Sequence, residues 1–188
     1  MNAPARETAP MVRTRVLAVL DSDKDVMRCY LSGGQHEAND LKLTRLTALA
    51  GRLADSALMA ESQNWSRIFL HKILGYASGW VVSLGMTWVQ PAISAERDRQ
   101  DHLFRSGKHQ FSCTSPIVDV ARKFRVLMEE IGEVAEAIDR LEATSKPHNA
   151  TAAIMHLTRE LIQVAAVTTA WLESLETPGS STKGEKAS

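Results

Sequence analysis

Apolar residues recur with helical spacing in the C-terminal half of the chain. Between Val118 and Leu141 they lie three and four positions apart, so a helix turning by about 100° per residue gathers them on one stripe. This stripe consists of Val120, Phe124, Leu127, Ile131, Val134, Ile138 and Leu141. A second stripe consists of Leu157, Leu161, Val164, Val167, Trp171 and Leu175. The two patterns predict a pair of amphipathic helices with their apolar faces buried.

The first of these helices carries a cluster of glutamates. Glu129, Glu133 and Glu136 lie opposite the apolar stripe, whereas Glu130 lies at its edge. We therefore expect Glu130 and Glu133, three residues apart, at the border between core and solvent. For Glu129 and Glu136 we favour a solvated acidic face, because exposed like charges at this spacing cost little free energy.

Glu160 occupies a different environment, since it projects within the apolar arc of the second helix. An ionised carboxylate in such a place is costly unless it is paired or coordinates a metal ion. Two arrangements would satisfy it. One is a salt bridge to a basic residue such as Arg125 or Lys123, and the other is a cation shared with Glu130 and Glu133.

The N-terminal half shows weaker periodicity. A helix is expected to begin at Asn39 or Asp40, and shorter apolar runs before it predict brief helices. No segment alternates clearly enough to predict a sheet, so the predicted fold class is all-α, a helical bundle. The apolar positions of the longer helix are Leu46, Leu49, Ala50 and Leu53.

The stretch from Ile73 to Ala95 has no charged residue and is long enough to span a bilayer. Gly75 and Gly79 also have the small-residue spacing of paired membrane helices. Gln90, Pro91 and several hydroxyl side chains interrupt its apolar character, however. We therefore expect a helix buried in protein on most sides, with glycines that let a neighbour approach closely, and no membrane association.

Composition narrows the functional classes. Lys plus Arg and Asp plus Glu both number 22, so the net charge is zero and gives no electrostatic basis for binding nucleic acid. Cys29 and Cys113 have the spacing of neither a metal knuckle nor a redox pair. The opening Met1 to Pro10 lacks the apolar core of a signal peptide, which favours a reduced, cytoplasmic protein. The histidines form no HExxH or ExxH arrangement, which argues against a zinc protease or a di-iron bundle.

The glutamate clusters resemble a known family. Glu129-Glu130-Ile131-Gly132-Glu133, followed by Glu160-Leu161-Ile162-Gln163, is similar to the Glu-Glu-x-x-Glu and Glu-x-x-Asp metal-binding pattern of the MazG-like, all-α nucleoside triphosphate pyrophosphohydrolases. Glu96 to Gln100, then Phe104 to Gly107, look like the short helix and loop that open many small members of this family. The pattern departs at Gln163, where the family has Asp. An amide oxygen can still bind Mg²⁺, but it brings no negative charge.

The resemblance covers residues 92–176 and implies three parts. Residues 1–91 form an N-terminal helical region of no assigned role, residues 92–176 form the MazG-like domain, and residues 177–188 have the composition of a disordered tail. We expect Pro91 to separate the first two parts. We also expect Ser115 and Pro116 to be the N-cap and first residue of the first hairpin helix.

The resemblance also implies an activity. A (d)NTP would be hydrolysed to the monophosphate and pyrophosphate with Mg²⁺, or Mn²⁺, and the protein would assemble as a dimer or tetramer. The alternatives are a catalytically degenerate module that binds a nucleotide or protein partner, and a purely structural helical protein. The implied metal ligands are Glu130, Glu133, Glu160 and Gln163. The implied catalytic residues are Glu129, Glu130, Glu133 and Glu160. The residues assigned to substrate binding are Lys123, Arg125, His156 and Trp171.

Overall fold

The computed structural model describes residues 9–22, 24–33, 37–58, 63–144 and 147–176, and the regular structure within these ranges is entirely helical. This confirms the predicted all-α bundle. The tail predicted for residues 177–188 lies outside the described residues. The helices are α1 (Ala9–Ser22), α2 (Lys24–Gly33), α3 (Asn39–Leu58), α4 (Gln63–Ser83), α5 (Val89–Arg105), α6 (Val120–Glu142) and α7 (Pro147–Glu176).

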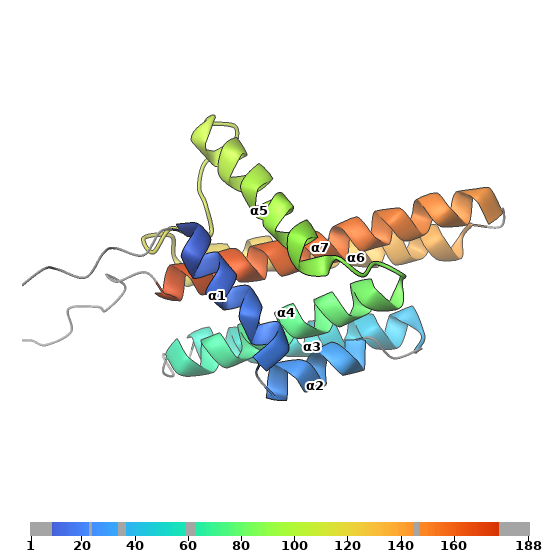
Figure 1. Cartoon of the computed structure of the whole chain (residues 1–188), viewed down its shortest axis with the longest axis horizontal. Helices are drawn as coiled ribbons and strands as arrows, with labels where there is room; N and C mark the ends of the chain where they lie inside the picture. Colours follow the sequence, from blue (N-terminus) through green and yellow to red (C-terminus); the bar gives the residue numbers. More distant parts are fainter. Residues whose placement is uncertain (1–8, 23, 34–36, 59–62, 145–146, 177–188) are drawn as a thin grey trace, which may run out of the picture.

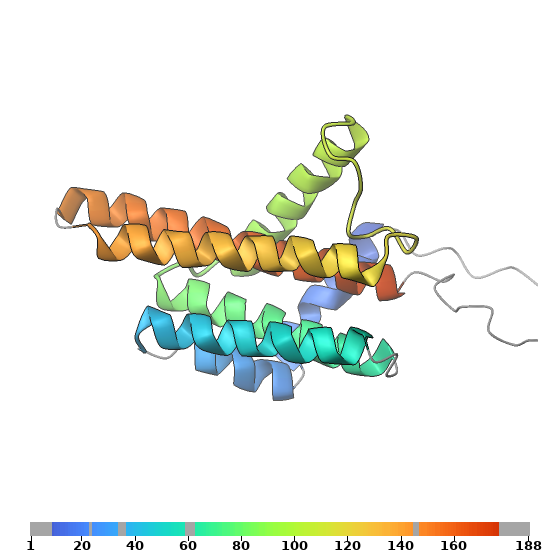
Figure 2. The same ribbon diagram turned by 180° about the vertical axis from the view of Figure 1, so that it is seen from behind.

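The helices form stacked layers (Figures 1 and 2). The long antiparallel hairpin of α6 and α7 covers α3 and α4, and α2 packs against α4 on the side away from the hairpin. Helix α1 crosses one end of the bundle and contacts α7. Helix α5 packs on α7 near its own start and then projects away from the body. The N-terminal helices and the hairpin therefore share one core.

The two predicted apolar stripes form the interior of the hairpin. On α6 the central members of the stripe are buried, while Val120 at the start of the helix stays partly exposed. On α7 the stripe is buried from Leu157 through Trp171. Helical periodicity alone places these side chains, and burial of the two stripes against each other and against α3 and α4 accounts for the position of the hairpin.

The predicted start of the first hairpin helix is wrong by several residues. Helix α6 begins at Val120, and Asp119 is its N-cap, because the Asp119 carboxylate accepts a hydrogen bond of 2.7 Å from the backbone N–H of Arg122. Ser115 and Pro116 lie instead in the loop of residues 106–119 that follows α5. The helix thus begins at the carboxylate that caps it and not at the Ser-Pro pair.

The uncharged stretch from Ile73 to Ala95 is two helices, not the single helix expected. Helix α4 ends at Ser83, and Gly85 adopts a positive φ of 99° in the turn that follows. Pro91 lies in the first turn of α5, where its missing N–H would have no partner within the helix. It therefore belongs to the start of a helix. Among the described helices, none has the length and apolar character that crossing a membrane requires.

Gly75 does allow the close helix approach predicted for this stretch. A Cβ atom at Gly75 would lie 2.7 Å from the backbone oxygen of Val26 in α2, which is shorter than real Cβ atoms permit. The absence of a side chain at this position therefore lets α2 and α4 pack with their backbones almost in contact.

A network of charged side chains joins α1, α5 and α7. The Arg13 guanidinium of α1 contacts Asp98 at 2.6 Å, Asp101 at 2.8 Å and Glu173 at 3.0 Å. Arg97 of α5 is buried and contacts the same Asp101 and Glu173. Because Asp98 and Asp101 belong to α5 and Glu173 to α7, the two arginines tie the projecting helix to the hairpin.

Candidate functional site

Three glutamates from the hairpin converge at its surface. Glu130 and Glu133 of α6 and Glu160 of α7 each offer a carboxylate oxygen, and these three atoms lie within 4.8 Å of one another. The spacing of three residues places the first two on adjacent turns of α6, and the antiparallel packing of α7 brings the third beside them. The structure thus brings together the three acidic residues that the sequence predicts to be metal ligands.

Glu130 is the least satisfied of the three. It is largely buried, and its Oε2 atom is inaccessible to solvent and has no hydrogen-bond partner among the residues that the structure describes. Burial, followed by the charges of Glu133 and Glu160, raises the pKa of Glu130 to about 8. Without a cation, Glu130 therefore holds a proton near neutral pH, and a bound cation would replace that proton.

Glu133 is more exposed but is affected by the same crowding. Partial desolvation raises its pKa, and the nearby carboxylate of Glu160 raises it further. Carboxylates this close repel one another when ionised, because they have no proton to share and only accept hydrogen bonds. The proximity of Glu133 and Glu160 is thus a second sign that positive charge belongs here.

Glu160 is 3% exposed and has polar partners on its own helix. Its Oε1 accepts from Nε of Arg159 at 3.2 Å and lies 2.9 Å from Nδ1 of His156. Its Oε2 accepts a hydrogen bond from Nε2 of Gln163. The salt bridge considered from the sequence, to Arg125 or Lys123, is not the arrangement observed.

Gln163, the residue at the family's Asp position, points to the same cluster. Its amide nitrogen is engaged with Glu160, so its carbonyl oxygen is the atom it could offer to a cation. Gln163 also lines the adjacent cavity. Its position matches the predicted ligand set, although a carbonyl adds no charge.

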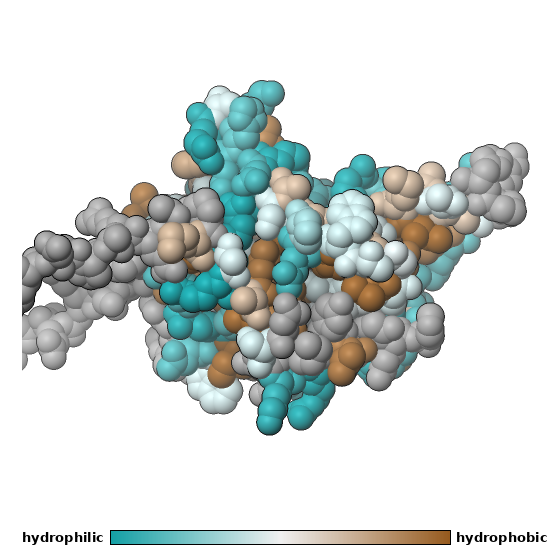
Figure 3. Space-filling view, viewed as in Figure 1, coloured by the Kyte–Doolittle hydropathy of each residue, from teal (hydrophilic) through white to brown (hydrophobic). Residues whose placement is uncertain are grey.

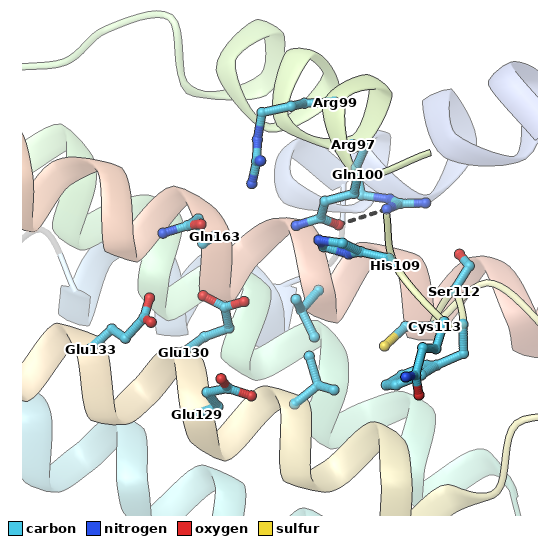
Figure 4. A pocket seen from close by; sticks show the side chains of 14 residues that line it. Arg97, Arg99, Gln100, His109, Ser112, Cys113, Glu129, Glu130, Glu133 and Gln163 are labelled. Atoms are coloured by element: carbon cyan, nitrogen blue, oxygen red, sulfur yellow. Dashed lines mark hydrogen bonds between the residues drawn. The ribbon is translucent and has the colours of Figure 1, made fainter. Parts of the chain in front are cut away.

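A cavity of about 470 Å³ opens beside the glutamates. Its walls come from α5, from the loop of residues 106–119, and from α6 and α7 (Figure 4). Glu129, Glu130 and Glu133 form one side and basic residues of α5 form the other, so the cavity has an acidic and a basic end. The size lies within the range of small-molecule pockets. The lining residues used below are Arg97, Arg99, Gln100, His109, Phe111, Glu129, Glu130, Glu133 and Gln163.

The predicted substrate-binding residues mostly lie elsewhere. Lys123 is buried, its Nζ donates to Oγ of Ser174 at 2.7 Å, and burial lowers its pKa to about 8. Trp171 is buried in the core, and Arg125 is exposed on α6. His156 lies beside Glu160 and so touches the acidic cluster. The structure therefore brings one of these four residues, His156, to the cluster and none of them to the cavity wall.

The cavity wall includes residues to which the sequence assigned no role. Arg97, Arg99 and Gln100 of α5, with His109 and Phe111 of the loop, line the side that faces the glutamates. Phe111 is itself covered by Arg122, whose guanidinium carbon lies 4.0 Å from the ring centroid. The charged run of α5 was the available signal, but charged residues on a helix ordinarily indicate a solvated face.

The chain was compared with protein-family models, with curated proteins and with solved structures, and none of the three comparisons gives a match.

Proposed function

We propose that this chain is a nucleoside triphosphate pyrophosphohydrolase that uses Mg²⁺ or Mn²⁺ to convert a (d)NTP to the monophosphate and pyrophosphate. The observation that carries the proposal is the convergence of Glu130, Glu133 and Glu160 within 4.8 Å at the edge of a cavity of nucleotide-compatible size. The likeness of the two glutamate segments to the MazG-like pattern supplies the reaction.

The chemistry of the donor set fits this type of cation. Carboxylate and carbonyl oxygens are the ligands that Mg²⁺ and Mn²⁺ prefer, whereas zinc sites generally contain His or Cys. The buried, unpartnered Oε2 of Glu130 provides a ligand atom that no side chain of the described residues occupies. The proximity of the Glu133 and Glu160 carboxylates likewise favours a bound positive charge.

The residues divide into ligands and supporting groups. Glu130, Glu133 and Glu160 would hold the cation, with the carbonyl of Gln163 as a further ligand. When bound, the cation supplies Lewis-acid polarisation of the α–β phosphoanhydride. Glu129 is exposed at the acidic end of the cavity, where its carboxylate could accept a proton from the attacking water.

His156 and Arg159 act on Glu160. Both lie within 3.2 Å of its Oε1 atom, so they hold the carboxylate in one orientation. Arg159 is largely exposed, so its contribution is weakened by solvent. Neighbours on its own helix thus orient the Glu160 carboxylate before a cation binds.

Self-association is part of the proposal. A second hollow, lined mainly by apolar residues, lies between the turn after α4 and the N-terminal half of α7, and Figure 3 shows hydrophobic surface in this region. Trp88 and Met155, both more than half exposed, contribute to it. Apolar surface of this kind supports a contact between subunits. Sedimentation of the wild type and of Met155→Glu would test it, because a charge in the contact should shift the protein toward monomer.

The cytoplasmic location expected from the sequence also stays a proposal. Cys113 is buried and forms no disulfide, which fits a reducing compartment.

A degenerate module that binds a nucleotide or a protein is the second candidate. The observation in its favour is Gln163, whose amide nitrogen donates to Glu160 and thereby satisfies one of the oxygens that a cation would use. Such a protein would bind a nucleotide without turning it over.

The experiment is an assay of pyrophosphate release from a panel of nucleoside triphosphates with Mg²⁺ or Mn²⁺. Wild type should release pyrophosphate rather than orthophosphate from at least one of them. Glu133→Gln should be inactive, and Gln163→Asp should be faster because it restores a charged ligand. Nucleotide binding by the wild type without turnover in either wild type or Gln163→Asp would refute the enzyme and favour the module.

A further inference from the structure

Two arginines of α5, Arg97 and Arg99, line the cavity on the side that faces the glutamates. Arg97 is buried, and its guanidinium donates to three side chains: Gln100 (2.7 Å), Asp101 (2.9 Å) and Glu173 (3.4 Å). It is therefore committed to holding α5 against α7. The dashed line in Figure 4 marks its bond to Gln100.

Arg99 is in a different situation. Its side chain is 52% exposed and, in Figure 4, extends from α5 toward the part of the cavity that carries Gln163 and Glu130. Its Nε and Nη2 atoms donate to the two carboxylate oxygens of Glu96, each at 2.7 Å. A phosphate binds a guanidinium in the same two-pronged manner. A phosphate group in the cavity could thus take the place of Glu96.

Glu96 is held against the cavity wall. Its side chain is only 13% exposed, and it also accepts a hydrogen bond of 3.1 Å from Nε2 of Gln100, a residue of the cavity wall. The charge of Glu96 contributes to the raised pKa of Glu130. The hydrogen bond to Glu96 raises the pKa of Arg99, and the charge of Glu130 raises it further. Glu96 is therefore bonded to two residues of the cavity wall, Arg99 and Gln100, on the side that faces the hairpin glutamates.

We propose that the substrate exchanges the partner of Arg99, because its phosphates displace Glu96 from the ion pair. The polyphosphate of a cation-bound substrate takes the guanidinium of Arg99, and the carboxylate of Glu96 is released toward the cation held by the hairpin glutamates. This inference rests on the proposed function and assigns two further residues to it. The released carboxylate supplies the negative charge that Gln163 lacks, so the full charge of the ligand set is reached only when substrate is present.

The test measures two affinities of the full chain by titration calorimetry, one for Mn²⁺ alone and one for inorganic triphosphate at saturating Mn²⁺. Arg99→Gln should bind triphosphate about tenfold more weakly, because the charge-assisted contact is lost. The same variant should bind Mn²⁺ alone more tightly than the wild type, since Glu96 is no longer neutralised. Glu96→Gln should bind Mn²⁺ alone as the wild type does and triphosphate more weakly.

The double variant Glu96→Gln/Arg99→Gln separates the exchange from general repulsion. If Arg99 merely repels cations, its removal improves Mn²⁺ binding in either background. If Arg99 restrains Glu96, the improvement disappears when position 96 is Gln. Arg105→Gln is the matched control, because Arg105 is exposed in the last turn of α5 and does not line the cavity. Arg99→Lys, which keeps the charge but not the two-pronged geometry, repeats the triphosphate measurement if Arg99→Gln unfolds.

The outcomes distinguish failure of the proposed function from failure of the exchange. A wild type that binds no Mn²⁺ refutes the proposed function and the exchange with it. A wild type that binds both probes, with affinities unchanged in Arg99→Gln and Arg99→Lys, overturns only the exchange. A gain in Mn²⁺ affinity that persists in the double variant also overturns it.

Discussion

Replacing Glu130 by Gln should change how the stability of the cation-free protein depends on pH. Burial and the neighbouring carboxylates raise the pKa of Glu130 from its usual 4.5 to about 8. Between these values the folded state holds a proton that the unfolded state has lost. The stabilisation linked to this proton is fully present below pH 4.5 and is lost as the pH rises through 8. Gln keeps the size of the side chain and removes the titration.

The size of the effect follows from the two pKa values. One pKa unit corresponds to about 1.4 kcal/mol, so the wild type should lose roughly 4 kcal/mol relative to Glu130→Gln between pH 5 and pH 9. Contributions from all groups outside the cluster cancel in this comparison. The difference in stability between the variant and the wild type should therefore widen in favour of the variant as the pH rises.

Urea unfolding followed by circular dichroism at pH 5, 7 and 9, with EDTA present, measures this difference. Glu142→Gln is the control, since Glu142 is exposed at the end of α6, and its stability should follow that of the wild type at each pH. A difference between Glu130→Gln and the wild type that stays constant from pH 5 to pH 9 would show that Glu130 carries no extra proton in the folded state. The inference from its unpartnered oxygen would then fail.

Three further results are expected. Mg²⁺ or Mn²⁺ at a hundredfold excess over the dissociation constant should stabilise the wild type by about 2.7 kcal/mol. Glu133→Gln should lose this effect. Thermal melts at several cation concentrations measure it, and identical melting of both proteins would contradict the metal site. Lys123→Met should be more stable than the wild type at pH 7 by up to roughly 3 kcal/mol, because burial lowers the Lys123 pKa to about 8. The unfolded chain keeps that proton up to about pH 10.5, so the stability of the wild type should rise from pH 8 to 10.5. Urea unfolding should therefore show a smaller advantage of the variant at pH 10 than at pH 7. Gly75→Ala should lower the free energy of unfolding by about 1 to 3 kcal/mol, because its Cβ would meet the backbone oxygen of Val26. If chemical denaturation shows no such loss, α2 and α4 can move apart.

The hairpin and its acidic cluster were predictable because local periodicity determines them. The spacing of three residues between Glu130 and Glu133 places both on one edge of a helix, whatever else the chain does. Glu160 lies inside an apolar arc, so the sequence indicated its burial, and the structure confirms that burial. Which helices would face each other followed from the two apolar stripes.

The basic wall of the cavity could not be predicted because long-range contacts create it. Arg97 is buried through its contacts with Glu173, far along the chain, and nothing in the local pattern of α5 indicates this. Lys123 was expected to reach the substrate, but a hydroxyl on another helix, that of Ser174, binds it in the interior. Periodicity shows which face of a helix is polar, but it does not show whether that face meets water or a charged partner.

The contacts of Arg13 have a consequence for how the protein can be divided. A fragment of residues 92–176 would retain each of the hairpin glutamates. It would lose Arg13 of α1, whose guanidinium contacts Asp101 and Glu173. Arg97 alone would then pair with both carboxylates, so two negative charges would share one guanidinium. Without α4, the apolar face of α7 would also be open to water. The glutamate pattern is therefore not a portable unit, and a truncation guided by it would remove the support of the wall that carries Arg99.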